Sequence, residues 1–90
     1  MISRKKIENF CADNDVEVQF IINHDNAIIG LSTCFCEFKV VYSYLKIIEN
    51  LGQDMTMEEA IEFFDFNIGN SFQGENPPII LRDDMDWSEY

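Results

Sequence analysis

The stretch from Thr56 to Ile68 reads TMEEAIEFFDFNI, and it contains the clearest fold signal of the chain. Thr56 followed three residues later by Glu59 has the form of a capping box, in which each side chain bonds the backbone N–H of the other residue. The apolar residues that follow recur at helical spacing. We therefore expect a helix that begins after Thr56, runs to about Ile68 and buries Met57, Ala60, Ile61, Phe64 and Ile68.

Two further helices are expected upstream of this stretch. Ser3 is a suitable N-cap for a short helix with Ile7, Phe10 and Cys11 on one face. From Lys39 onward the apolar residues again follow a helical period, and Gly52 is a natural residue after a helix end. The second helix is indicated by Val40, Val41, Tyr44, Leu45, Ile48 and Leu51.

The remaining segments indicate strands. Val16, Val18, Phe20 and Ile22 recur at every second position, as in a strand with one buried face. The turn formers 23–26 and the apolar residues 27–31 follow, so we expect a β-hairpin over about 16–33. The two prolines at 77–78 force an extended entry into a short edge strand at about 79–81. The expected fold class is α+β: a small antiparallel sheet, made of this hairpin and the short C-terminal strand, packed with about three helices.

Composition limits the number of domains and the classes of partner. The chain has 90 residues, 47% of them apolar, which suits one small α+β domain over 1–82 with an acidic C-terminal tail at 83–90. Seventeen acidic residues against six basic ones give a net charge of −11. Binding to nucleic acid or to an anionic membrane requires clustered Lys and Arg, so neither is expected. The N-terminus lacks the apolar part of a signal peptide, and we expect a cytoplasmic protein.

The negative charge is concentrated in the second half of the chain. Residues 1–46 have a net charge of −1, whereas residues 47–90 contain eleven acidic residues, a single arginine and a net charge of −10. On the predicted helix Glu58, Glu62 and Asp65 form one stripe with about 6 Å between neighbours, flanked by Glu59. Such a row either keeps the protein soluble or binds a basic partner, for which it can imitate backbone phosphates.

The C-terminal tail combines acids with aromatic residues. Acids steer an encounter and aromatic side chains anchor it, so the tail either orders on a partner or folds back over the sheet. The expected partner-binding residues are Glu58, Glu59, Glu62, Asp65, Asp83, Asp84, Asp86 and Trp87.

No pattern indicates a catalytic, cofactor or metal site. His24, Cys34 and Cys36 lack a fourth ligand and the usual spacing of a zinc site. Together with Cys11 the two cysteines are expected to be reduced thiols. Glycines 69 and 74 match the spacing of a phosphate loop, but Glu75 and Asn76 stand where Lys and Ser or Thr belong. We expect a protein that is not an enzyme and that needs no cofactor.

The segments Glu59–Asn67 and Gly74–Ile80 resemble a pattern of small uncharacterised bacteriophage and prophage proteins. That pattern reads roughly Glu-Ala-x-Glu-aromatic-x-aromatic-Asn, followed by Gly-Glu-x-x-Pro and a short apolar strand. The resemblance implies a small viral accessory protein in the host cytoplasm and assigns no site residues. With the charge, it leads us to expect an inhibitor that binds a basic surface of a host protein, such as a nucleic-acid-binding site, as a DNA mimic. The alternative is a self-associating assembly module, for example a homodimer, whose acidity only confers solubility.

Overall fold

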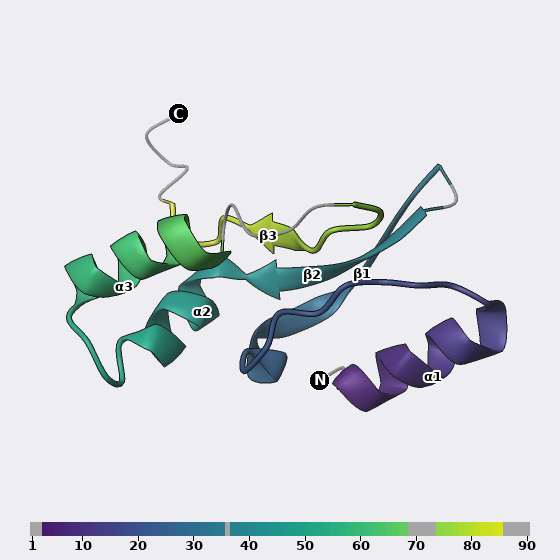
Figure 1. Ribbon diagram of the computed structural model, residues 1–90, viewed down its shortest axis with the longest axis horizontal. Coiled ribbons are helices and arrows are strands. Elements are labelled where there is room, and N and C mark those ends of the chain that lie inside the picture. Colours follow the sequence, from purple (N-terminus) through teal and green to yellow (C-terminus); the bar gives the residue numbers. More distant parts are fainter. Residues whose placement is uncertain (1–2, 36, 69–73, 86–90) are drawn as a thin grey trace.

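The computed structural model describes residues 3–35, 37–68 and 74–85 and confirms the α+β class (Figure 1). Its sheet has the strand order β1-β2-β3, antiparallel between β1 and β2 and parallel between β2 and β3. The helices lie at the two ends of the sheet in Figure 1, α1 at one end and the packed pair α2 and α3 at the other. The elements are α1 (Arg4–Asn14), a 3-10 turn (Asp25–Ala27), β1 (Ile28–Cys34), β2 (Glu37–Ser43), α2 (Tyr44–Leu51), α3 (Met57–Phe63), a π-helical turn (Phe64–Ile68) and β3 (Ile79–Leu81).

Two helix starts predicted from the sequence are confirmed. The Ser3 hydroxyl caps α1 by accepting a hydrogen bond from the Lys6 amide at 3.3 Å. The capping box of α3 is complete, because Thr56 and Glu59 each accept a hydrogen bond from the other's backbone N–H, both at 3.2 Å. The helical path then continues through the π-helical turn to Ile68, as expected.

The predicted position of the hairpin is wrong. The hairpin consists of β1 and β2, with Ile28 opposite Tyr42 and Cys34 opposite Glu37. The sequence of β2, EFKVVYS, alternates with period two and places Val40 and Tyr42 in the core. The helix expected from Lys39 begins only at Tyr44, because the Ser43 hydroxyl accepts a hydrogen bond from the Lys46 amide at 3.1 Å and caps α2 there.

Residues 16–22, predicted as the first hairpin strand, lie outside the sheet, with 16–21 in neither a helix nor a strand and Ile22 in a turn. Side chains from elsewhere hold its backbone. The Tyr42 hydroxyl accepts a hydrogen bond from the Ile21 amide at 2.9 Å, and Asn76 Nδ2 donates to the Glu17 carbonyl at 3.0 Å. The chain turns at Asn23, whose φ is +71°, so Ile21 is buried and Ile22 is exposed, the reverse of the expected alternation.

The short C-terminal strand is confirmed, and it lies at the sheet edge as expected. Its direction was not expected: Val41 pairs with Ile79 and Ser43 with Leu81 in a parallel ladder. A parallel pair requires a crossover connection, which α2 and α3 provide. The two helices are therefore held between neighbouring strands of one sheet.

The core lies where these elements meet. Ile7 and Cys11 of α1 enter it, as do residues of β2, α2 and the α3 region; Ala60, Phe64 and Ile68 are buried as predicted, but Met57 and Ile61 are exposed. In the described part of the chain, no helix is long and apolar enough to cross a bilayer.

Replacing the fully buried Tyr42 with Phe tests how the 16–22 segment is held. Tyr42→Phe removes the hydroxyl that accepts the hydrogen bond of the Ile21 amide. A buried amide left without an acceptor costs about 1–3 kcal/mol. We expect the free energy of unfolding to fall by that amount and the Ile21 amide to lose protection in hydrogen exchange. Unchanged exchange at Ile21 would contradict this role of the Tyr42 hydroxyl.

Candidate functional site: the acidic end formed by two helices

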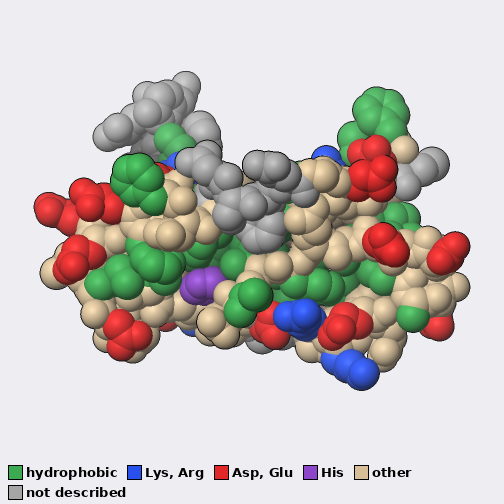
Figure 2. All heavy atoms as spheres, in the orientation of Figure 1, with side chains coloured by type: hydrophobic (Ala, Val, Ile, Leu, Met, Phe, Trp, Pro, Cys, Tyr) green, Lys and Arg blue, Asp and Glu red, His purple; other side chains and the backbone are tan. Residues whose placement is uncertain are grey.

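The acidic stripe, Glu58, Glu62 and Asp65, lies exposed on α3 and the turn that follows it. All six Lys and Arg residues belong to the described part of the chain, and none forms an ion pair with Glu58 or Glu62. Figure 2 shows acidic side chains at both ends of this face, whereas the most prominent basic side chains lie toward the α1 end. No Lys or Arg side chain therefore neutralises Glu58 or Glu62 within residues 3–35, 37–68 and 74–85.

The other predicted helix acid, Glu59, has a structural contact. Its carboxylate accepts the Thr56 amide hydrogen bond of the capping box. Glu59 therefore stabilises the start of α3, in the first turn where an acid also complements the helix dipole.

Asp83, predicted as a partner-binding residue of the tail, binds the start of α2. Its Oδ1 accepts a hydrogen bond from the Leu45 amide at 2.9 Å, and its Oδ2 accepts one from the Ser43 hydroxyl at 2.5 Å. Partial desolvation raises the pKa of Asp83, but these hydrogen bonds outweigh it, and the net effect is a lowered pKa. Asp83 thus joins the end of β3 to the N-terminus of α2.

Asp84 is also bound within the chain. Its two carboxylate oxygens accept hydrogen bonds from Arg82 Nε and Nη2 at 2.8 and 2.9 Å, and these bonds lower the pKa of Asp84. The Arg82 guanidinium lies 3.9 Å from the centre of the Tyr44 ring. The Phe64 ring packs edge-on against the same Tyr44 ring, with 4.8 Å between the two ring centres. The one cation of residues 47–90 is therefore engaged by Asp84. Asp86 and Trp87 lie outside the described residues.

A groove lies between α2 and α3. It has a volume of about 360 Å³ and a mostly apolar lining. Leu45, Met57 and Ile61 are 53%, 63% and 38% exposed there, although Met57 and Ile61 were expected in the core. The lining consists of Tyr44, Leu45, Ile48 and Glu49 from α2, Met57 and Ile61 from α3, and Asp84.

No feature of the sequence indicated this groove. Met57, Ala60, Ile61, Phe64 and Ile68 span about 100° of a helix, the ordinary width of an apolar stripe that faces a core. Ala60, Phe64 and Ile68 face the core, which leaves Met57 and Ile61 at its margin. Only the position of α2 shows that these two side chains, with Leu45, line a groove.

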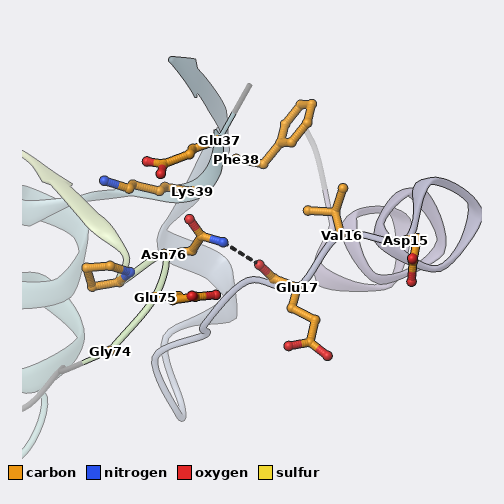
Figure 3. Close-up of a pocket in the computed structure, with 10 residues that line it drawn as sticks. Asp15, Val16, Glu17, Glu37, Phe38, Lys39, Gly74, Glu75 and Asn76 are labelled. Atoms are coloured by element: carbon orange, nitrogen blue, oxygen red, sulfur yellow. Dashed lines mark hydrogen bonds between the residues drawn. The ribbon is translucent and has the colours of Figure 1, made fainter. Parts of the chain in front are cut away.

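A second hollow, of about 720 Å³, lies between β2, the 15–17 segment and the 74–77 segment (Figure 3). It is polar and contains Asp15, Glu17, Glu37 and Glu75 with one cation, Lys39. In Figure 3 Glu37 and Lys39 lie on one side of Asn76, while the Glu17 carboxylate extends away on the other. Within residues 3–35, 37–68 and 74–85, no three His, Cys, Asp or Glu side chains could hold a metal ion.

His24 is buried and forms part of a polar cluster. The Asn50 amide lies 3.2 Å from His24 Nδ1, and Asn50 and Asn26 exchange two side-chain hydrogen bonds at 2.7 and 3.1 Å. Burial lowers the pKa of His24, and the charge of Asp25 opposes this shift in part. Cys11 is a buried free thiol and Cys34 an exposed one, while Cys36 lies outside the described residues.

The sequence matches no protein-family model and no curated protein, and the structure matches no solved structure.

Replacing Asp83 with Ala tests its contact with α2. Loss of a helix-capping carboxylate costs about 1 kcal/mol, and we expect the free energy of unfolding at pH 7 to fall by that amount. Because the folded pKa of Asp83 is lowered, its contribution is complete above the unfolded value of about 3.9 and is lost as the pH falls through the folded pKa. Urea titrations should therefore show wild type and variant converging in strong acid, and a constant difference would exclude the ionised carboxylate as the cause.

His24 should make stability depend on pH in a different range. Because its pKa is lower in the folded than in the unfolded protein, the unfolded state binds more protons below about pH 6.5. Stability should be complete above that pH and fall below it, by at most about 1.4 kcal/mol per pH unit, until the folded-state pKa is passed. The pH profile of His24→Gln should lack this decline, and an unchanged profile would show that another group is responsible.

Proposed function

We propose that this protein is a non-enzymatic acidic binding protein, a phage-type inhibitor that places its α2–α3 end against a basic surface of a host protein. The proposal rests on one observation above all: Glu58 and Glu62 are exposed on one helix with no cationic partner. Asp65 extends the stripe, and residues 47–90 have a net charge of −10.

The energetic cost of this arrangement supports a use beyond solubility. Like charges four residues apart on a helix repel each other by a few tenths of a kcal/mol. A chain under selection only for solubility and stability would disperse its acids or alternate them with lysines. A rigid row of carboxylates about 6 Å apart instead imitates a phosphate backbone and speeds encounter with a basic target. The inferred partner is therefore a nucleic-acid-binding site of a host protein.

Self-association is the second candidate function, because β3 lies at the edge of the sheet and several apolar side chains are exposed. Ile79 and Leu81 lie on β3, and Phe66 is 80% exposed. In a dimer built on these residues the acidic stripe would remain free in solvent. Sedimentation at two salt concentrations separates the two candidates, since a salt-insensitive dimer supports self-association.

Reversing two charges of the stripe tests the proposed function. We expect Glu58→Lys/Glu62→Lys to abolish retention of a host protein in pull-downs from bacterial lysate, because both carboxylates would face the partner. Retention by the wild type should weaken steeply as salt is raised.

The control variant, Asp13→Lys/Glu17→Lys, makes the same change in net charge away from α3. It should leave retention unchanged. Equal loss of retention in the two variants would show that binding depends on net charge and not on the stripe. Unchanged retention by the stripe variant would refute the proposal.

A further inference from the structure

The groove between α2 and α3 has an apolar floor, and the acidic side chains of Glu49 and Asp84 contribute to its lining. We infer that it binds an amphipathic helix of a partner protein, one whose apolar stripe is flanked by Lys and Arg. This inference rests on the proposed function, because it assigns the anchoring site and the chemical class of the partner segment to the same acidic end of the molecule.

The floor of the groove provides the apolar anchor sites. Leu45 projects from α2, and Met57 and Ile61 project from α3, all into one groove of about 360 Å³. Each is more than a third exposed, and the ring of Tyr44 and the side chain of Ile48 are buried beneath them. Water-exposed apolar side chains that meet in a groove between two packed helices suit an entering helix with apolar residues at i, i+3, i+4 and i+7.

The borders of the groove are acidic. Residues in a helix advance by about 100° each, so Glu58 lies about 60° around α3 from Ile61. Glu62 lies farther around the helix and lines a separate hollow with Glu59, Phe63 and Phe66. On α2, Glu49 lines the groove beside Leu45, and its one ion pair is with the exposed Lys46 at 3.2 Å. Burial of Tyr44 in the floor raises its pKa. The positive charge of Arg82 lowers this pKa, and the negative charges of Asp84 and Asp65 raise it further.

These charges favour a basic partner over the other possible occupants of an apolar groove. The C-terminal residues 86–90, DWSEY, contribute two acids and no base, so like charge opposes their entry. A second copy docking through the same face would bring two acidic stripes together. A helix with lysines or arginines on both sides of its apolar stripe would instead meet Glu49 of α2 on one side and Glu58 of α3 on the other.

A synthetic peptide tests the inference on the full-length protein. The probe is a Leu/Lys peptide about four helical turns long, with leucines at helical spacing and lysines elsewhere, and its comparison is a scrambled peptide of the same composition. Fluorescence anisotropy gives the affinity of each peptide, and amide chemical shifts locate the contact.

We expect the ordered peptide to bind at least about tenfold more tightly than the scrambled one, with the largest shifts at Leu45, Ile48, Met57 and Ile61. Met57→Lys and, separately, Leu45→Lys should weaken its binding about tenfold or more, since each places a cation in the groove. The matched control is Phe35→Lys, an apolar-to-lysine change on a 95% exposed side chain in the β1–β2 turn, and it should leave the affinity unchanged.

Equal binding of the two peptides, absence of binding, or shifts confined to other surfaces would overturn the inference. It would also fail if Trp87→Ala alone altered the groove amides, or if those amides changed with protein concentration, because the tail or a second copy would then be the occupant. Failure of the proposed function is distinguishable, since it is measured by the lysate retention of Glu58→Lys/Glu62→Lys and does not depend on either peptide.

Discussion

The parallel pairing of β3 with β2 is the constraint on which the rest of the structure depends. It returns the chain to the middle strand of the sheet and requires α2 and α3 to form the crossover between the paired strands. Asp83 completes this arrangement by bonding both the Ser43 hydroxyl and the Leu45 amide at the start of α2. β3 has only three residues and forms a short ladder with β2. The hydrogen bonds of Asp83 therefore add a second connection between the end of β3 and the start of α2.

The same arrangement determines which charges remain free. Four acidic residues that were expected to face a partner divide into two groups: Asp83 and Asp84 bind Ser43, Leu45 and Arg82, whereas Glu58 and Glu62 have no cationic partner. Arg82 is the one Lys or Arg of residues 47–90, and it is stacked on Tyr44 and held by Asp84. The C-terminal half therefore has no other cation for Glu58 and Glu62. Exposed apolar side chains beside uncompensated acids are the combination that a basic amphipathic partner would complement.

Local signals predicted the starts of α1 and α3, but they missed the start of α2, because the apolar residues of β2 precede the Ser43 cap at helical spacing. The Ser3 cap and the Thr56–Glu59 capping box were recognised from residue type and spacing, and both are present. The hairpin was misplaced because alternation in 16–22 reflects partial burial rather than ladder pairing, and the backbone there bonds Tyr42 and Asn76 instead. Of the candidate site, the stripe followed from helical spacing, but the groove depends on how α2 and α3 meet.

The sequence by itself determined the acidity, the concentration of that acidity in the second half, the starts of α1 and α3, and the short strand at 79–81. These properties depend on composition and on contacts between near neighbours in the chain. Tertiary structure alone decided the strand partners, the direction of β3, and which carboxylates are bound and which are free. Those outcomes depend on contacts between distant residues, such as Ser43 and Asp83, which are forty residues apart in the chain. No local sequence pattern predicts such contacts.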